Sequence, residues 1–265
     1  MITLVKIGAL EYLTAENIAV PHAFTTRAGG VSSGYLASMN LGAHRGDKPE
    51  NVAQNYEILA DALGFSTEKL VLTRQTHSDI VLSVSDLDAC GTDHRAYPES
   101  DALITNTKGV ALAVFTADCT PILLYDPESG AVGAAHAGWR GTASEIAAKT
   151  VKAMQTAFGC RPEQLCAAIG PNIGPCCFQT DADVPLAMQE AFGAAAKAHI
   201  IQKDEKYYVN LKALNALSLR RAGVANIAVS AECTFCNPDR FWSHRHHGAQ
   251  RGSQGAIIVC KEANR

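Results

Sequence analysis

The chain has 265 residues, of which 47% are hydrophobic and 6% aromatic, and it carries a formal net charge of −3. This charge leaves no basic field for nucleic acid or an anionic membrane, and no stretch approaches the ~18 apolar residues of a membrane helix. The N-terminus lacks a secretory signal pattern, and an odd count of nine cysteines favours reduced thiols. We therefore expect a cytoplasmic α/β enzyme with neither nucleic-acid nor membrane partners.

In chain order, apolar runs predict a series of strands flanked by helices. The strands are expected at 79–84, 101–105, 110–117, 121–126, 130–135, 166–170, 206–210, 226–231 and 255–260. The helices are expected at 50–63, 143–157, 182–198 and 211–222. Because no repeat or Pro/Gly/Ser-rich linker interrupts the chain, residues 1–265 are predicted to form a single α+β domain. Its core is expected to be a mixed, largely antiparallel sheet with helices packed outside.

The sharpest local prediction concerns the middle of the chain. The run VALAVFTADC ends at Cys119, and PILLYD is followed by turn residues. Pairing of 121–126 with 131–136 as a hairpin brings Cys119 opposite residue 138, close to His136. A thiol and an imidazole at one sheet end fit either a Cys nucleophile with a His base or a metal site.

The string AAHAGWRGT leads from this strand into a predicted helix. Residues 142–145, TASE, match a capping box, so the helix is expected to begin at Ala143. Helix N-termini favour anions, and Arg140 precedes this one. The pattern therefore predicts an anion site just after His136. Packing of the Arg140 stem along Trp139 is the competing interpretation.

A second imidazole comes from RQTHSD, which places His77 at the start of another predicted strand. Two imidazoles and one thiolate suit a catalytic zinc with an open fourth position for water. The spacings between His77, Cys119 and His136 form no local motif. Hydrogen-bonded structural histidines and a core cysteine are therefore the alternative interpretation.

Other cysteines and one glycine-rich loop allow two interpretations each. Cys233 and Cys236 form a CxxC followed by histidines at 244–247, which fits a zinc site or a redox pair, although zinc-finger spacing is missing. The vicinal pair Cys176-Cys177 is more typical of packing than of chemistry. The loop FTTRAGGVSSG, with Arg27, could hold a phosphate through backbone N–H groups or be a plain surface turn.

Eight strings taken together resemble a known family. They are FTTRAGGVSSG, SMNLGAHRGD, RQTHSD, DALIT, TADCTPILLYDP, AAHAGWRGT, IGPNIGPCCF and CTFCNPDRFWSHR, and they run in order from about residue 22 to residue 260. The chain resembles the proteins called multicopper polyphenol oxidases or laccase-domain proteins. That family was later described as purine nucleoside phosphorylases with adenosine deaminase activity.

The resemblance implies a fold and a metal site. The implied fold is a layered α/β/β/α sandwich without a Rossmann crevice. The implied zinc ligands are His77, Cys119 and His136. The string at 243–246, SHRH, departs from the family's Ser-x-Arg-Arg, and Cys236 is not a family requirement. This departure favours a structural role for the CxxC pair over an essential metal.

The implied activity is zinc-dependent phosphorolysis and deamination of purine nucleosides such as adenosine and inosine, with phosphate as co-substrate. Catalytic roles are expected for Asp118, Gln75 and Arg140, with Asp79 as a second candidate for carrying the proton. Substrate-binding roles are expected for Arg27, Asn40 and Arg45. The oligomeric state is left open.

Three other functions compete with this interpretation. Thiolate and imidazole ligands also suit copper, as in a polyphenol oxidase, although nine histidines are too few for a blue-copper centre plus a trinuclear cluster. A Cys119–His136 hydrolase acting on peptidoglycan precursors is a second alternative, because some family members are linked to peptidoglycan editing. A zinc-stabilised protein that binds a partner is the third.

Overall fold

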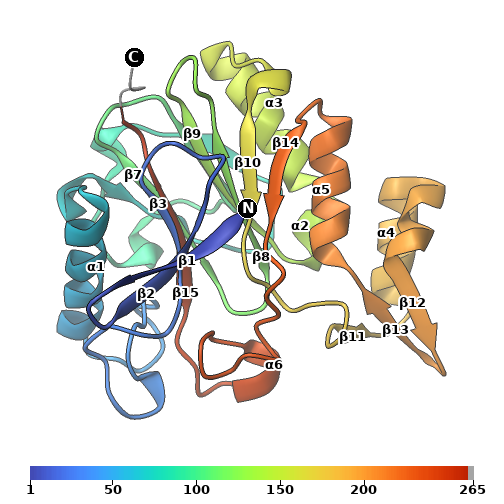
Figure 1. The fold of residues 1–265 in the computed structure, drawn as a ribbon, viewed down its shortest axis with the longest axis horizontal. Coiled ribbons are helices and arrows are strands. Elements are labelled where there is room, and N and C mark those ends of the chain that lie inside the picture. The colour runs from blue at the N-terminus through green and yellow to red at the C-terminus, as the bar shows by residue number, and fades with distance from the viewer. Residues whose placement is uncertain (262–265) are drawn as a thin grey trace.

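The computed structural model describes residues 1–261, and its strands form three sheets (Figure 1). The first sheet has the order β1 (Ile2–Ile7), β2 (Leu10–Ala15), β3 (His22–Thr25), β15 (Gln254–Val259), β7 (Ala111–Thr116), β4 (Leu70–Val71). The second has the order β14 (Asn226–Val229), β10 (Cys166–Ile169), β8 (Thr120–Tyr125), β9 (Val132–Ala137), β6 (Ala102–Thr105), β5 (Val81–Ser83). A small third sheet has the order β11 (Gln179–Thr180), β13 (Lys206–Val209), β12 (Ile200–Lys203).

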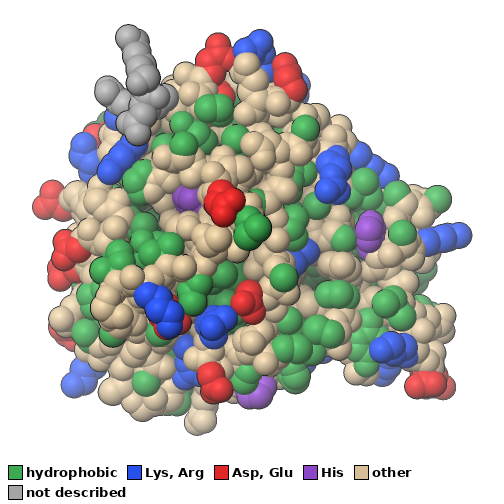
Figure 2. All heavy atoms as spheres, viewed as in Figure 1, with side chains coloured by type: hydrophobic (Ala, Val, Ile, Leu, Met, Phe, Trp, Pro, Cys, Tyr) green, Lys and Arg blue, Asp and Glu red, His purple; other side chains and the backbone are tan. Residues whose placement is uncertain are grey.

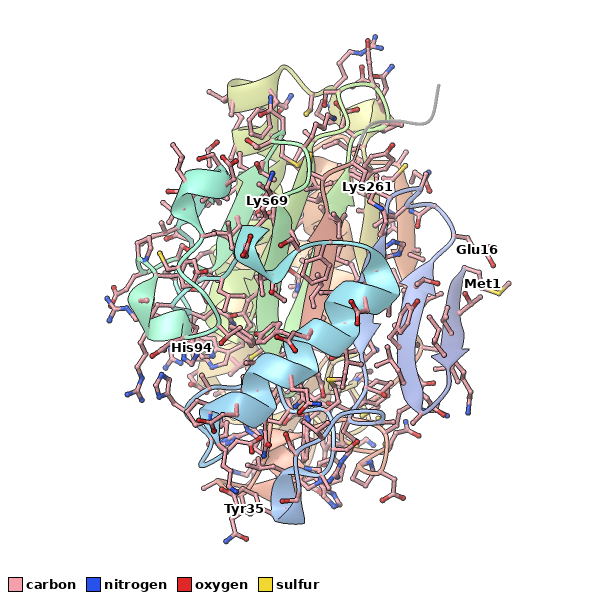
Figure 3. All side chains as sticks on the ribbon, turned by 90° about the vertical axis from the view of Figure 1, so that its left-hand side faces the viewer. Met1, Glu16, Tyr35, Lys69, His94 and Lys261 are labelled. Atoms are coloured by element: carbon pink, nitrogen blue, oxygen red, sulfur yellow. The ribbon has the colours of Figure 1, made fainter. Side chains whose placement is uncertain are left out.

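Helices cover the outer faces of the two large sheets, as Figure 1 shows. Those on the sheet faces are α1 (Pro49–Leu63), α3 (Ile146–Phe158) and α5 (Leu211–Arg221), with the short α2 (Trp139–Ala143) beside α3. Away from these faces, α4 (Asp183–Phe192) packs against the third sheet and α6 (His244–His247) lies in the loop before β15. Figure 3 shows α1 lying across the first sheet. Proline at its first position and Gly64 in a left-handed conformation after its last residue explain where α1 begins and ends. The layers are therefore α/β/β/α, as the resemblance implies.

The alternation of side chains along β8 shows why two cores form. Leu123 and Tyr125 belong to the core between the two sheets, whereas Ile122 and Leu124 belong to the core under α3 and α5. Because neighbouring residues of a strand point to opposite faces, a strand that is apolar on both faces is buried between two layers. All six residues of β8 are buried.

The ladder pattern confirms a mixed, largely antiparallel core. Only three adjacent pairs among the described strands are parallel, namely β4 with β7, β5 with β6, and β10 with β14. Each predicted strand segment overlaps an observed strand. The predicted hairpin also has the expected register, because Pro121 pairs with His136 and Thr120 with Ala137.

Two predicted helix boundaries are wrong. The helix expected to begin at Ala143 is instead the short α2, which begins at Trp139, followed by α3 from Ile146. The capping box does not form, because Glu145 has a left-handed backbone, with φ of 54°, and separates the two helices. The helix expected at 182–198 ends at Phe192, and a 3-10 segment follows it.

The surface carries charges of both signs. On the face drawn in Figure 2, Lys and Arg side chains are interspersed with Asp and Glu. Within residues 1–261, every helix is too short or too polar to cross a bilayer.

The strands β1, β2 and β3, which precede the first predicted strand, were not expected from the sequence, and they extend the first sheet at its edge.

Candidate active site

His77, Cys119 and His136 meet at one end of the second sheet. His136 lies on β9, Cys119 immediately precedes β8, and His77 lies in the loop between β4 and β5. The hairpin register places Cys119 opposite Gly138, and a Cβ built on Gly138 would lie 3.3 Å from the Cys119 sulfur. Glycine at this position therefore leaves room for the thiol and for the ring of His77.

A buried carboxylate, Asp101, holds both histidines. Its Oδ1 accepts hydrogen bonds from His136 Nδ1 at 2.7 Å and from the His77 backbone N–H at 3.1 Å. Its Oδ2 accepts from the backbone N–H of Thr76 at 3.1 Å and of Ser78 at 2.7 Å. His77 adopts a left-handed backbone with φ of 60°, a strained conformation that these bonds stabilise. Sequence reasoning missed Asp101, although a polar residue opening the apolar DALIT run was a usable signal.

The Cys119 thiol and the His136 imidazole shift one another's protonation. Burial would raise the pKa of the Cys119 thiol, but the charges of His136 and His77 outweigh it and lower that pKa to about 6. Burial would lower the pKa of His136, but the Cys119 thiolate and Asp101 raise it to about 9. Without metal, this pair is therefore a thiolate and an imidazolium at neutral pH.

This thiolate predicts selective alkylation of the metal-free protein. At pH 7 we expect iodoacetamide to modify Cys119 ahead of Cys160, whose thiol pKa is raised to about 12 by burial. The rate at Cys119 should fall as the pH drops through about 6, because the thiolate exists above that pKa. Peptide mass spectrometry after timed alkylation measures this, with Cys119→Ser as the control. A rate that rises only above pH 8 would contradict the assignment.

The three side chains are spaced as metal ligands are. One donor atom from each of His77, Cys119 and His136 lies within 4.8 Å of the others, and His77 Nε2 lies 3.8 Å from Cys119 Sγ. Since Asp101 occupies Nδ1 of His136, the Nε2 atom is left for a ligand role, as in carboxylate–histidine–metal arrangements. The set can therefore hold a metal ion and leave one position open.

These three side chains open into a pocket that also contains two guanidinium groups. Its lining includes His77, Cys119 and His136, and further Gly42, Arg45, Thr73, Gln75, His94, Phe115, Thr116, Ala117, Arg251 and Ser253. Within residues 1–261, neither Arg45 nor Arg251 forms an ion pair with a carboxylate. Of the predicted substrate-binding residues, Arg45 is thus the one that the structure places in the pocket lining.

Asp118 lies beside the site rather than in the pocket lining. Its backbone is left-handed, with φ of 93°, and its side chain is buried. Its Oδ1 accepts from the Thr234 hydroxyl at 2.6 Å, and its Oδ2 accepts from the Arg245 backbone N–H at 2.7 Å. Asp79, the second candidate, forms an ion pair with Lys149. These two hydrogen bonds therefore hold Asp118, the residue immediately before Cys119, in place.

Two predicted polar residues, Gln75 and Asn40, hold backbone segments. The Gln75 amide exchanges two hydrogen bonds with the backbone of Phe115, at 2.8 and 2.6 Å. Asn40 is fully buried, and its Oδ1 accepts from the backbone N–H groups of Gly42 and Ser253. Gln75 lines the pocket itself, whereas Asn40 fixes two residues that line it.

The two other predicted arginines lie outside the pocket lining. The Arg140 guanidinium lies 4.3 Å from the centre of the Trp139 ring, and the side chain is exposed. The Arg27 guanidinium lies 4.0 Å from the Trp242 ring and donates to the carbonyls of Ala37 and Pro238. The contact of Arg140 with Trp139 is therefore the one that the competing interpretation, packing of the Arg140 stem along Trp139, predicts.

Sequence reasoning missed two groups that line the pocket, His94 and Arg251. His94 comes from the loop before β6 and is labelled in Figure 3; its ring centroid lies 5.5 Å from that of Phe115. Burial, and then the charge of neighbouring His44, lower the pKa of the His94 imidazole, which favours its neutral form. The one available signal for His94 was the length of the stretch 86–100, which contains none of the predicted strands or helices.

The fold and the site together define an α/β/β/α sandwich protein with a two-histidine, one-cysteine cluster in a pocket. The family model described as multi-copper polyphenol oxidoreductase laccase matches residues 21–261. The chain therefore belongs to this laccase-like family.

Named relatives and a solved structure agree with this assignment. A purine nucleoside phosphorylase of Deinococcus radiodurans is 42% identical, over 94% of this chain and 92% of its own length. The purine nucleoside phosphorylase YlmD of Bacillus subtilis is 36% identical, over 94% and 91%. The crystal structure of YlmD from Geobacillus stearothermophilus matches with a TM-score of 0.91 at 36% identity, covering 98% of this chain and 99% of that one. The relatives indicate an enzyme that acts on small molecules.

Proposed function

We propose that the chain is a zinc-dependent purine nucleoside phosphorylase that also deaminates adenosine and works in the cytoplasm. The observation that carries the proposal is one pocket that combines a two-histidine, one-cysteine ligand set with two guanidinium groups lacking carboxylate partners among the described residues. The names of the relatives support the choice of purine nucleosides as substrates.

Arg45 and Arg251 are the proposed phosphate site. Burial, and then the nearby charge of Arg45, lower the pKa of Arg251 to about 10. Burial also lowers the pKa of Arg45. Two partly desolvated cations that repel one another are stabilised by an anion between them, and guanidinium groups bind phosphate oxygens in pairs. Phosphate is therefore the anion that we assign to this end of the pocket.

The purine is assigned to the part of the pocket lined by His94, Phe115 and Thr116. Two buried polar atoms here, His94 Nδ1 and Thr116 Oγ1, have no hydrogen-bond partner within the described residues. Buried polar atoms normally have partners, so these two are available to a ligand. A neutral His94 can exchange a proton or a hydrogen bond with a ring nitrogen, and Phe115 offers an aromatic face or edge for the base.

Zinc is the metal that best fits the ligand set, since two imidazoles and one thiolate with an open position are typical of catalytic zinc. A zinc ion held by His77, Cys119 and His136 would supply a Lewis acid and activate water for deamination. Asp101 would fix the tautomer and orientation of His136, and thereby keep its Nε2 directed to the ion.

The two proposed reactions are phosphorolysis of a purine nucleoside and deamination of adenosine. In phosphorolysis a phosphate oxygen forms a bond to C1′ of the ribose, the C1′–N9 bond breaks, and the purine takes up a proton as it leaves. In deamination a water oxygen adds at C6 of adenine and the amino group leaves as ammonia, which gives inosine from adenosine. We assign the protein's proton transfers to His94. Asp118 is assigned the positioning of Cys119, and Gln75 the positioning of Phe115.

The arginine assignment predicts a specific change in phosphate dependence. Arg251→Ala should raise the phosphate KM for inosine cleavage at least about tenfold, which corresponds to about 1.4 kcal/mol. Arg140→Ala should leave that KM unchanged, because its guanidinium stacks on Trp139 outside the pocket lining. Initial rates measured against phosphate concentration compare the two variants. A raised phosphate KM in Arg140→Ala, with a normal one in Arg251→Ala, would move the phosphate site to the start of α2.

The proposed function itself is tested by product analysis on the whole chain. Chromatography should show hypoxanthine released from inosine faster in the presence of phosphate, and inosine formed from adenosine without phosphate. Stripping the metal or introducing Cys119→Ser should abolish both reactions, and zinc should restore only the stripped wild type. Phenol oxidation with copper but no nucleoside turnover would establish the oxidase alternative instead.

A further inference from the structure

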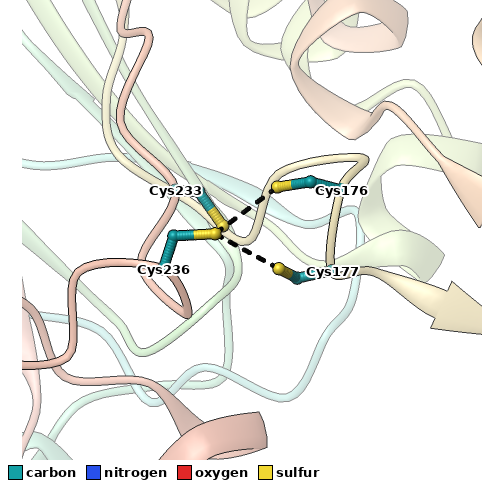
Figure 4. A group of neighbouring side chains, drawn as sticks. All are labelled: Cys176, Cys177, Cys233 and Cys236. Atoms are coloured by element: carbon teal, nitrogen blue, oxygen red, sulfur yellow. Dashed lines mark hydrogen bonds between the residues drawn. The ribbon is translucent and has the colours of Figure 1, made fainter.

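Four cysteine thiols from two distant segments meet away from the pocket. They are Cys176, Cys177, Cys233 and Cys236, and Figure 4 shows them facing one another across two loops. All four sulfur atoms lie within 4.8 Å of one another. The sequence predicts packing for the vicinal pair and treats the CxxC separately, whereas the structure brings the two pairs together.

The parallel pairing of β10 and β14 explains this meeting. Because parallel neighbours end at the same edge of a sheet, the loops that follow them leave side by side. The backbone of Asn172 forms a parallel bridge with that of Cys233, and the Thr234 N–H donates to the Asn172 carbonyl at 3.0 Å. Gly174 allows the closest approach, since a Cβ there would lie 3.2 Å from Cys176 Sγ and 3.4 Å from Cys233 Sγ.

The sulfur arrangement fits one tetrahedral metal ion. With Zn–S bonds of about 2.3 Å, neighbouring thiolates of a tetrahedral site lie about 3.8 Å apart. The Cys236 sulfur lies 3.7 Å from that of Cys176 and 3.3 Å from that of Cys177. These separations are also too long for disulfides, and all four thiols are free. We propose that Cys176, Cys177, Cys233 and Cys236 bind a structural zinc ion.

Neighbouring groups suit the negative charge of a zinc tetrathiolate. The Gly174 backbone N–H donates to Cys233 Sγ at 3.1 Å, as N–H groups do around thiolate ligands. The buried Lys212 ammonium donates to the carbonyls of Ser230 and Glu232, the latter immediately before Cys233. A tetrathiolate site has a net charge of about −2, so one buried cation beside it is favourable. Four protein ligands leave no open position, which makes the site structural.

This zinc would anchor the segment that holds Asp118. Thr234 lies between the two CxxC cysteines in sequence, and its hydroxyl donates to Asp118 Oδ1, next to Cys119. The Arg245 N–H, further along the same segment, donates to the other oxygen of Asp118. The cysteine site thus fixes the chain that supports Cys119 from outside the pocket. The proposal stands on these contacts and does not depend on the proposed function.

Zinc counting in variants of each site tests the proposal. After gel filtration with a mild chelator, elemental analysis of Cys119→Ser should find about one zinc per chain, held by the four cysteines. Adding Cys236→Ser to this variant should remove that zinc. Adding Cys90→Ser instead should retain it, because Cys90 is an exposed thiol outside both clusters. A Cys119→Ser protein that contains no zinc and binds none on titration would overturn the proposal, as would iron in its place.

A second measurement avoids any folding defect of the Cys236 variant. The Cys119→Ser protein is reconstituted with Co²⁺, whose visible and near-ultraviolet spectrum reports geometry and thiolate ligation. Intense tetrahedral bands with strong thiolate-to-cobalt charge transfer are expected, and added zinc should abolish them. A weak octahedral spectrum, or a disulfide between cluster cysteines in freshly reduced protein by mass spectrometry, would contradict a four-thiolate zinc site.

Discussion

Replacing Asp101 with asparagine is expected to weaken zinc binding at the His77–Cys119–His136 site about 10- to 100-fold, with a parallel loss of nucleoside turnover. The carboxylate has no exposed surface and accepts hydrogen bonds on both oxygens. An asparagine has one oxygen and one NH2 group, so its NH2 must face backbone N–H donors in either orientation. With the NH2 group in place of Oδ1, the His77 N–H and the His136 ring lose their acceptor. With the NH2 group in place of Oδ2, the N–H groups of Thr76 and Ser78, on either side of His77, lose theirs.

Competition with a chromophoric chelator measures this zinc affinity. Asp79→Asn is the matched control, because it removes a carboxylate two residues from His77 that pairs with Lys149 at the surface. The control should bind zinc as the wild type does. Equal zinc affinity in Asp101→Asn and the wild type would refute the role assigned to Asp101.

The same substitution should change the acid stability of the metal-free protein. Burial would raise the pKa of Asp101, but His136 and Ser78 outweigh it and lower that pKa to about 2. A lowered pKa contributes stability above the unfolded value near 4, and this contribution is lost as the pH falls toward 2. The difference in free energy of unfolding between wild type and Asp101→Asn should therefore shrink across that window, as denaturant titrations at several pH values would show.

Gly138→Ala is the second substitution with a large expected effect. A Cβ at Gly138 would lie 2.6 Å from Cδ2 of the His77 ring and 3.3 Å from Cys119 Sγ. The backbone there has φ of −67° and ψ of 178°, which alanine adopts freely, so the effect acts through contact alone. Displacing a ligand by about 1 Å costs on the order of 100-fold in rate, and we expect at least this loss of turnover.

Gly141→Ala is the matched control for Gly138→Ala. It lies three residues further on, inside the short helix that Gly138 precedes, and its added Cβ would meet its nearest atoms at 3.5 Å, an ordinary contact. This variant should retain zinc and activity. Full activity with bound zinc in Gly138→Ala would show that the His77 ring does not occupy the position described.

The local part of the site could be predicted from the sequence, because a short hairpin fixes its own register. The turn after β8 determines that Cys119 lies near His136, and the register of β8 and β9 is the expected one. His77 could be assigned only through the family resemblance, since the loop that carries it is held by Asp101 across a parallel pair, β5 and β6. The spacing of residues along the sequence does not indicate such a contact between Asp101 and the His77 loop.

The parts that could not be predicted depend on which elements are neighbours in space. The four-cysteine cluster exists because β10 and β14 pair, although 60 residues separate Cys176 from Cys236. Arg251 reaches the pocket from the segment before β15, a strand of the other sheet. The start of α3 was misplaced for a local reason, because the left-handed Glu145 precedes it in place of the capping box that TASE predicts.

Phosphorus NMR of the reaction products tests the central claim most directly. Zinc-loaded protein incubated with inosine and inorganic phosphate should consume phosphate and form ribose 1-phosphate in step with the hypoxanthine released. The Cys119→Ser variant should form neither product. Hypoxanthine accompanied by free ribose and an unchanged phosphate signal would show hydrolysis instead, and an absence of purine release by zinc-loaded wild type would contradict the phosphorylase assignment altogether.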